Sequence, residues 1–238
     1  MNHPTDRFAG WRGLLPPIHP DGWPFVGIAA VATLILFLAW QPLGWIGLGA
    51  TLWVAAFFRD PWRVSPRVPG LALAPADGEI VAVDEASPPP ELDMEPTPML
   101  RIGVYLGPLD VHINRAAVAG RVTRIAYRKG AFGAAREAPA GDENERNAIR
   151  VAGPLGATAQ VQIAGRIARR IRCDLVEGQE VIAGQRIGLI RFGSRAEVYL
   201  PADWVPLVAV GQRAVAGETA IAAAPGVVIA APRGTVTQ

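Results

Sequence analysis

Two hydrophobic patterns divide the chain near residue 58. Residues 22–58 carry no charged side chain and are largely apolar. A helix needs about 20 apolar residues to cross the hydrocarbon core of a bilayer. Gln41-Pro42 interrupts this run, and proline starts a helix more readily than it continues one. We therefore predict two short apolar helices, over 24–40 and 43–58, that form a hairpin.

Arginines flank both outer ends of this predicted hairpin, and the turn between its helices has none. Arg7 and Arg12 precede the apolar run, whereas Arg59, Arg63 and Arg67 follow it. Cationic residues favour the cytoplasmic side of a membrane, so both ends are expected there. The lengths fit either a crossing or a shallow insertion, and a buried helical hairpin in a soluble core is the alternative.

A second pattern, of short β-type runs separated by glycine and proline, follows residue 59. Loop 86–98, rich in proline and acidic residues, interrupts the first predicted β-hairpin. Alternating apolar residues between turn signals indicate strands. The strands that we predict are 71–74, 78–84, 100–106, 120–127, 148–151, 157–163, 170–175, 185–192 and 197–200.

A short internal repeat refines the fold prediction. Gly178-Gln-Glu-Val-Ile-Ala-Gly184 recurs as Gly211-Gln-Arg-Ala-Val-Ala-Gly217. Each copy is typical of a turn, a short strand and a second turn, a rhythm that resembles lipoyl and biotinyl carrier domains. We therefore predict a mainly β protein: a compact β-sandwich, barrel-sandwich-like body with an N-terminal apolar helical hairpin. A carrier function is disfavoured because carriers need a lysine at a hairpin tip, which this chain lacks.

Composition removes several classes of function. The net charge is +2 and the isoelectric point is about 9.1, with arginine supplying almost all the cations. No basic run interleaved with aromatic residues points to nucleic acid. Cys173 is the sole cysteine, which excludes an intrachain disulfide. Lys129 is the sole lysine, so it is the only candidate for a Schiff base through a lysine.

Ser194, in the sequence Phe192-Gly-Ser194, is the first candidate for chemistry. It lies between two predicted strands, and the chain has only two other serines. The preceding Gly193 has no Cβ to obstruct approach to its carbonyl. This arrangement suits a serine hydroxyl that attacks the peptide bond on its own N-terminal side. A tight Gly-Ser turn in a hairpin is the alternative.

His112 is the only histidine in the predicted β body. It lies in a polar cluster with Asp110, Asn114 and Arg115 that follows an apolar strand. Histidine is the side chain best suited to proton transfer near neutral pH, although a lone histidine can also be structural. One histidine with scattered carboxylates makes a poor metal site, so we predict no metal.

Two further polar groups are candidates for the site. Asp77 occurs in Pro75-Ala-Asp-Gly-Glu79, where Asp-Gly is also a common turn dipeptide. Asn144-Glu-Arg-Asn147 precedes a predicted strand. Its arginine and amides could bind an anionic substrate, and a solvated loop is the alternative.

Taken together, the motifs resemble the phosphatidylserine decarboxylase family in its shorter bacterial and archaeal form. The resemblance covers nearly the whole chain and rests on the order and spacing of the apolar hairpin and five motifs. Two departures, Ala117 where the family usually has proline and the absence of a lysine in 134–142, lie away from the proposed reactive atoms. The motifs are Phe58-Arg-Asp-Pro61, Pro75-Ala-Asp-Gly-Glu79, Asp110-Val-His-Ile-Asn-Arg115, Asn144-Glu-Arg-Asn147 and Phe192-Gly-Ser194, which is followed by Glu197.

The resemblance implies a zymogen that makes its own cofactor by autocatalytic cleavage. Ser194 would attack the carbonyl of Gly193, and the chain would separate into fragments 1–193 and 194–238 that stay associated. The new residue 194 would carry a covalent pyruvoyl group. This ketone would form a Schiff base with the amino group of the substrate and accept electrons when carbon dioxide leaves.

The resemblance also implies a role for each candidate residue. His112 is expected to protonate the carbanion and to assist self-cleavage together with Asp77. Arg115, Asn114 and Arg146 are expected to contact the substrate, the two arginines through its phosphodiester. The reaction would convert phosphatidylserine to phosphatidylethanolamine, a step of phospholipid biosynthesis.

The expected organisation is a cytoplasmic segment 1–21, a membrane-associated hairpin 22–58 and a catalytic domain 59–238. The expected location is the cytoplasmic face of a bacterial inner membrane, where the protein is peripheral or held by its hairpin. A homo-oligomer is compatible with the sequence. Two alternatives stay open: a pyruvoyl-dependent decarboxylase of another amino-bearing substrate, and a non-enzymatic membrane-anchored β module that binds a partner.

Overall fold

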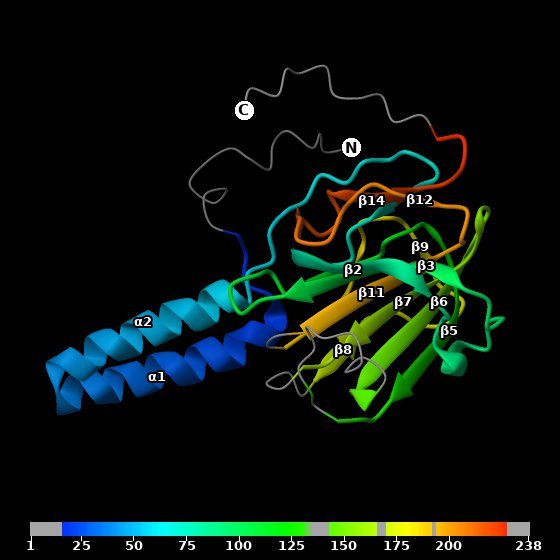
Figure 1. The fold of residues 1–238 in the computed structure, drawn as a ribbon. Helices are drawn as coiled ribbons and strands as arrows, with labels where there is room; N and C mark the ends of the chain where they lie inside the picture. The colour runs from blue at the N-terminus through cyan, green and yellow to red at the C-terminus, as the bar shows by residue number, and fades with distance from the viewer. Residues whose placement is uncertain (1–15, 132, 134–142, 166–169, 192–193, 228–238) are drawn as a thin grey trace, which may run out of the picture.

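An apolar helical hairpin projects from a β-rich body (Figure 1). The computed structural model describes residues 16–131, 133, 143–165, 170–191 and 194–227. A short 3-10 helix, η3 (Pro20–Gly22), leads into α1 (Trp23–Ala39), and α2 (Gln41–Phe57) returns beside it. The predicted hairpin is confirmed. The break falls at Trp40, because Gln41 and Pro42 already begin α2, and each helix begins one or two residues and ends one residue earlier than expected.

Small residues allow the two helices to pack closely. A Cβ at Gly44 would lie only 2.1 Å from the Phe37 ring, and the Thr33 and Thr51 hydroxyls are 2.8 Å apart. Close packing through glycine and hydroxyl pairs is typical of helices in lipid. Large apolar side chains point outward, among them Ile28, Leu38 and Ile46.

The segment Pro20–Ala39 is long and apolar enough to cross a membrane, with a mean hydropathy of 2.1. Only 11% of it is buried in the structure, unlike the core helix of a soluble protein. An exposed apolar surface of this kind favours contact with lipid or with another protein. The hairpin is therefore not buried in the core of the β body, and its membrane association stays a prediction.

The β body is built on a curled antiparallel sheet of eight strands, in the order β13-β2-β3-β11-β7-β6-β5-β9. Two three-stranded sheets, β1-β14-β12 and β4-β10-β8, complete it. The eight strands are β2 (Gly78–Ala86), β3 (Met99–Leu106), β5 (Gly120–Arg128), β6 (Arg146–Gly153), β7 (Gly156–Ile163), β9 (Glu180–Val181), β11 (Ser194–Leu200) and β13 (Arg213–Ala214). The smaller sheets comprise β1 (Leu71–Leu73), β14 (Ala220–Ala223), β12 (Val205–Pro206), β4 (Ile113–Arg115), β10 (Arg186–Ile190) and β8 (Ile171–Cys173).

The two sequence repeats cover the two edges of the large sheet. Strand β9 of the first copy pairs with β5, and β13 of the second pairs with β2. The Gly178 N–H donates to Val122 at 2.7 Å, and the Gly211 N–H donates to Ile80 at 2.8 Å. Both glycines adopt positive φ angles of about 90°, which favour glycine. The sequence repeat therefore corresponds to two equivalent turn–strand–turn units, and the mainly β fold is confirmed.

The main core lies between the large sheet and the β1-β14-β12 sheet. Ile80, Ile102 and Val198 from the large sheet pack against Ile221 and Trp204. Strand β11 pairs with β3 on one side and β7 on the other. The chain segment that begins at residue 194 therefore supplies a central strand rather than a peripheral one.

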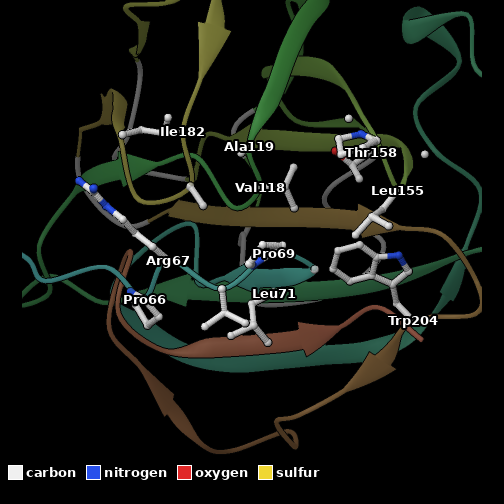
Figure 2. A pocket seen from close by; sticks show the side chains of 16 residues that line it. Pro66, Arg67, Pro69, Leu71, Val118, Ala119, Leu155, Thr158, Ile182 and Trp204 are labelled. Atoms are coloured by element: carbon white, nitrogen blue, oxygen red, sulfur yellow. The ribbon is translucent and has the colours of Figure 1, made fainter. Parts of the chain in front are cut away.

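An apolar cavity of about 540 Å³ lies beside this core (Figure 2). Leu71, Val118, Leu155 and Trp204 line it, and Arg67 lies at one side. Leu155 belongs to the β6–β7 turn, and Trp204 follows the C-terminal end of β11. The cavity is thus at the opposite end of β11 from Ser194.

The strand predictions were incomplete where pairing is short or non-local. Strands β4, β12 and β14 were missed because two to four residues show too little alternation to be recognised. Strand β10 ends at Ile190 rather than residue 192, and β11 begins at Ser194 rather than residue 197. Phe192 and Gly193 lie outside the described residues.

Candidate active site

Ser194 and Asp77 lie at the same end of three adjacent strands. Ser194 is the first residue of β11 and pairs with Leu106, the last residue of β3. Asp77 directly precedes β2, in which Glu79 pairs with Tyr105 of β3. The register therefore places Asp77 and Ser194 on either side of the end of β3.

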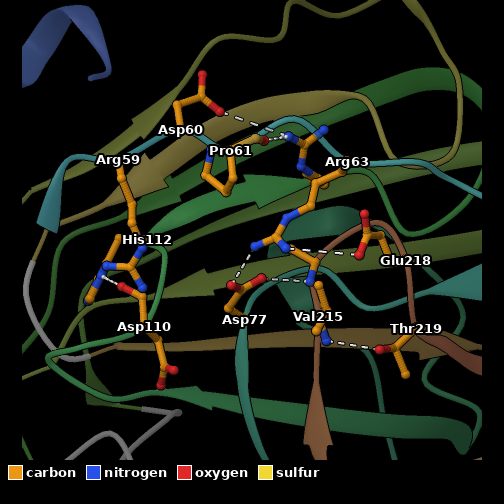
Figure 3. Close-up of polar contacts among 12 residues, drawn as sticks. Arg59, Asp60, Pro61, Arg63, Asp77, Asp110, His112, Val215, Glu218 and Thr219 are labelled. Carbon is orange, nitrogen blue, oxygen red and sulfur yellow. Dashed lines mark hydrogen bonds and ion pairs between the residues drawn. The ribbon is translucent and has the colours of Figure 1, made fainter. Parts of the chain in front are cut away.

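His112 reaches the same region through the loop that follows β3. Gly107 donates its N–H to Asp110 Oδ2 at 2.8 Å, which holds this loop in a tight turn. The His112 carbonyl accepts a 3.3 Å hydrogen bond from Ile190, at the end of β10 and four residues before Ser194. Asp77, Asp110 and His112 lie in one polar region (Figure 3).

Ser194 is completely buried, and its Oγ forms no hydrogen bond with any described residue. A buried polar group without a partner costs about 1–3 kcal/mol, so it calls for an explanation, and a catalytic role is one. The hydroxyl is therefore not committed to a structural bond. Gly193, the other half of the predicted cleavage site, lies outside the described residues.

Asp77 is held through both carboxylate oxygens. Oδ1 accepts the Ala216 N–H at 2.8 Å, and Oδ2 lies 2.7 Å from an Arg63 nitrogen (Figure 3). Burial raises the pKa of Asp77, although the Ala216 N–H and the Arg63 charge oppose that rise. A carboxylate with a raised pKa can exchange a proton closer to neutral pH than an exposed one.

His112 is buried and kept neutral by its surroundings. Burial lowers its pKa to about 4, against the opposing effect of the Asp110 carbonyl and carboxylate. Its Nδ1 lies 2.9 Å from the Asp110 carbonyl oxygen, and the Phe57 ring packs on the imidazole with centroids 4.1 Å apart. The neutral ring is the form that accepts a proton.

The three predicted substrate contacts differ in their environment. Asn114 is fully buried, and its Oδ1 accepts a 2.9 Å hydrogen bond from Gln162. Its Nδ2 has no partner among the described residues. Arg115 instead donates to the Gly184 carbonyl at 2.8 Å and the Pro61 carbonyl at 3.2 Å. Asn114 therefore offers a spare donor, whereas Arg115 is bound within the protein.

Arg146 is paired with an acid from the long loop after β2. Its Nε and Nη2 lie 2.5 and 2.9 Å from the two carboxylate oxygens of Glu91. The register aligns Arg146 with Ile163 and Arg195 across the sheet, so its side chain is on the face opposite to Ser194. The structure does not bring Arg146 together with Ser194, and its substrate contact stays a prediction.

Comparison with known proteins shows the family of this chain. The family model described as phosphatidylserine decarboxylase matches residues 50–222. The phosphatidylserine decarboxylase proenzyme of Beijerinckia indica subsp. indica is 52% identical over 206 residues, which cover 87% of this chain and 89% of that protein. The chain belongs to the phosphatidylserine decarboxylase family. Members of this family are carboxy-lyases, so the protein is an enzyme.

Sequence reasoning missed one feature of this family member, a buried charged group beside Ser194. Arg195 is 1% exposed, and its Nε lies 2.8 Å from Glu197 Oε1 without the alignment of a hydrogen bond. The Tyr199 hydroxyl donates to Glu197 Oε2 at 2.7 Å. These three side chains alternate with Ser194, Ala196 and Val198, so they lie on the opposite face of β11.

We expect Glu197→Ala to destabilise the protein strongly. Glu197 is 3% exposed and is the carboxylate paired with the buried Arg195. Removing one partner of a buried ion pair leaves an uncompensated charge and typically costs about 3–5 kcal/mol. Chemical denaturation followed by circular dichroism measures the loss. Asp174→Ala, which removes an exposed ion pair with Arg172, is the control and should cost about 1 kcal/mol or less. Equal losses would contradict the prediction.

Proposed function

We propose that this enzyme decarboxylates phosphatidylserine to phosphatidylethanolamine after it cleaves itself between Gly193 and Ser194. The observation that carries the proposal is the buried Ser194 hydroxyl without a described partner, at the strand end shared with Asp77. Membership of the family supports the substrate, and the relative from Beijerinckia is named a proenzyme.

In the first step, Ser194 Oγ bonds to the carbonyl carbon of Gly193 and the peptide C–N bond breaks, which converts the amide to an ester. Loss of the Ser194 α-proton then breaks the ester C–O bond. The leaving group is the carboxylate that now ends fragment 1–193, and residue 194 becomes dehydroalanine. Water hydrolyses that residue to a ketone and releases ammonia. Neutral His112 is suited to accept the hydroxyl proton, and Asp77 to assist it.

The position of the cut explains how the two fragments could stay together. Ser194 is the first residue of β11, so the cleaved bond lies outside the ladder that joins β11 to β3 and β7. Strands β12, β13 and β14 of the same fragment also pair with strands of the larger one or with each other. We infer that fragments 1–193 and 194–238 remain one folded unit.

A pyruvoyl group at residue 194 would supply an electrophilic carbonyl for the substrate amine and an electron sink for decarboxylation. The residues present fit that group, because Ser194 is buried at the strand end with His112 and Asp77 nearby. Asn114 Nδ2 can donate to the substrate without losing a described bond. Arg115 and Arg146 would first have to release their present partners. We therefore favour Asn114 as the substrate contact.

The apolar hairpin supports action at a membrane surface. Segment 22–58 would insert into lipid, while 1–21 and the catalytic domain 59–238 would stay on the cytoplasmic face of the inner membrane. This arrangement brings the site to a lipid substrate. It favours phosphatidylserine over a soluble amino acid.

The test is intact-mass analysis of the purified full chain, together with release of labelled carbon dioxide from phosphatidylserine vesicles. We expect two masses, which correspond to fragments 1–193 and 194–238. The smaller fragment should react with a ketone reagent. Uncut but fully active protein would refute the pyruvoyl mechanism. Activity on free serine but not on vesicles would favour a different decarboxylase, and an uncut, inactive chain would favour the non-enzymatic module.

A further inference from the structure

The segment by which the hairpin enters the β body touches both proposed acid–base residues. Phe57, the last residue of α2, packs on the His112 ring with centroids 4.1 Å apart. Six residues later, Arg63 lies 2.7 Å from Asp77 Oδ2 (Figure 3). Between them, Arg59 donates to the Leu109 carbonyl at 2.6 Å, in the loop that carries His112. We call residues 57–63 the exit segment.

The exit segment is packed into the protein and is not a free linker. Phe57 and Phe58 are each 2% exposed and belong to one apolar cluster with Val111, Ile113 and Leu189. Val111 and Ile113 flank His112 in the sequence, and Leu189 lies on β10. The exit segment therefore shares its apolar packing with the strands that carry the site.

Polar contacts fix the same segment on its other side. The Asp60 N–H donates to the Pro17 carbonyl at 2.7 Å, and the His19 N–H donates to the Phe58 carbonyl at 2.8 Å. The Asp60 carboxylate pairs with Arg186 of β10 at 2.7 Å. The base of the hairpin is thus held at several points, so its placement can set the positions of Phe57 and Arg63.

We propose that the exit segment is a part of the reaction site in which Phe57 and Arg63 are positioning residues, holding His112 and Asp77 for self-cleavage. Docking of the apolar hairpin then completes the site, so the hairpin contributes to the chemistry as well as to membrane attachment. The inference rests on the proposed function, because the reaction it concerns is cleavage at Ser194.

Phe57 acts by covering the His112 ring. Among the described residues, the charged groups that act on His112 are Asp110 and Arg59, and neither changes in a Phe57 variant. Phe57→Ala would admit water, so the pKa of His112 should rise from about 4 toward the ordinary histidine value of about 6.5. The ring would then be protonated, and unable to accept a proton, at a higher pH than in the wild type.

Arg63 acts through its charge on Asp77. The other charged groups that face Asp77 are Asp110, Arg59 and Arg115, and Glu218 lies 3.9 Å from Arg63. Arg63→Gln removes the cation that lowers the pKa of Asp77, so that pKa should rise further. The carboxylate needed to assist self-cleavage would then be lost at a higher pH.

The experiment follows cleavage of freshly synthesised full-length precursor by intact mass between about pH 4.5 and 8.5. For Phe57→Ala and Arg63→Gln we expect the acid side of the pH–rate profile to move upward by about one pH unit or more. Phe57→Leu and Arg63→Lys, which keep the apolar cover and the charge, should restore most of the wild-type profile. The matched controls are Phe37→Ala, in an aromatic pair with Trp45 within the hairpin, and Arg67→Gln beyond the exit segment.

Each outcome decides one question. A wild-type chain that never divides contradicts the proposed function itself. A dividing wild type with unshifted profiles in Phe57→Ala and Arg63→Gln overturns the positioning roles alone, as does a uniform loss of rate that the two control variants share. If Phe57→Ala fails to fold by circular dichroism, the pH–rate profile of Arg63→Gln, compared with those of Arg63→Lys and Arg67→Gln, decides the question in its place.

Discussion

Ser194→Ala should remain a single chain of full length and release no carbon dioxide from phosphatidylserine. The variant lacks the oxygen that attacks the Gly193 carbonyl, and it also lacks the atom from which the ketone is made. Both the cleavage and the cofactor are therefore lost in one substitution. We expect turnover to fall by at least a factor of about 10³, the scale seen when a nucleophile is removed from an enzyme.

The same substitution should leave the fold intact, which separates a chemical from a structural effect. Ser194 Oγ has no described hydrogen-bond partner, so its removal relieves an unsatisfied buried group and should not lower stability. Thermal unfolding of Ser194→Ala is compared with that of Ser87→Ala, a control at an exposed serine that follows the end of β2 opposite to Asp77. A divided or active Ser194→Ala chain contradicts the mechanism.

The order of motifs along the chain was enough to nominate Ser194, His112 and Asp77. The apolar hairpin was predictable because an uncharged run interrupted by Gln41-Pro42 has few other stable forms. The repeat predicted two equivalent units, since matching glycines require matching turns. Both features depend on residues close together in the sequence, so the sequence alone was enough to predict them.

The partners of charged side chains could not be predicted in the same way. Arg146 was expected to meet substrate, yet Glu91, distant in sequence, occupies its guanidinium. Arg195 and Glu197 alternate with apolar residues as a solvent-facing strand would, yet they are buried. The 3-10 helix η4 (Pro90–Leu92), in the long loop after β2, places Leu92 in the apolar cluster on that face. A loop that is distant in sequence therefore decided the pairing of Arg146.

The contacts of the exit segment with the site could not be predicted from the sequence either. Arg63 appeared in the sequence only as a cation that flanks an apolar run. In the structure it is the ion-pair partner of Asp77, while Phe57 covers His112. A cation beside an apolar run can lie at a membrane surface or form an ion pair within the protein. The sequence is compatible with both roles, and only the tertiary structure distinguishes them.

His112→Gln should slow self-cleavage by about 10²- to 10⁴-fold, the usual contribution of a positioned acid–base group. Glutamine keeps the approximate size and polarity of histidine but cannot accept a proton at neutral pH. His19→Gln is the matched control, because His19 lies at the base of the hairpin and its ring accepts a hydrogen bond from Asp21. The rate is measured by intact mass on fresh precursor. Equal rates in His112→Gln and the wild type would remove His112 from the cleavage step.

The buried His112 also predicts how stability depends on pH. Its pKa is lowered from 6.5 in the unfolded chain to about 4 in the folded protein, so between these values the unfolded state binds more protons. Stability from this group is therefore complete above about pH 6.5 and is lost as the pH falls toward 4, by about 3 kcal/mol in total. His112→Gln has no such proton to bind, so its unfolding free energy should change less between pH 7 and 4 than that of the wild type. Denaturant titrations at each pH give the unfolding free energy of the two proteins. If it changes with pH equally in both, the folded protein accommodates the imidazolium, and the assignment of His112 as a neutral base in self-cleavage is wrong.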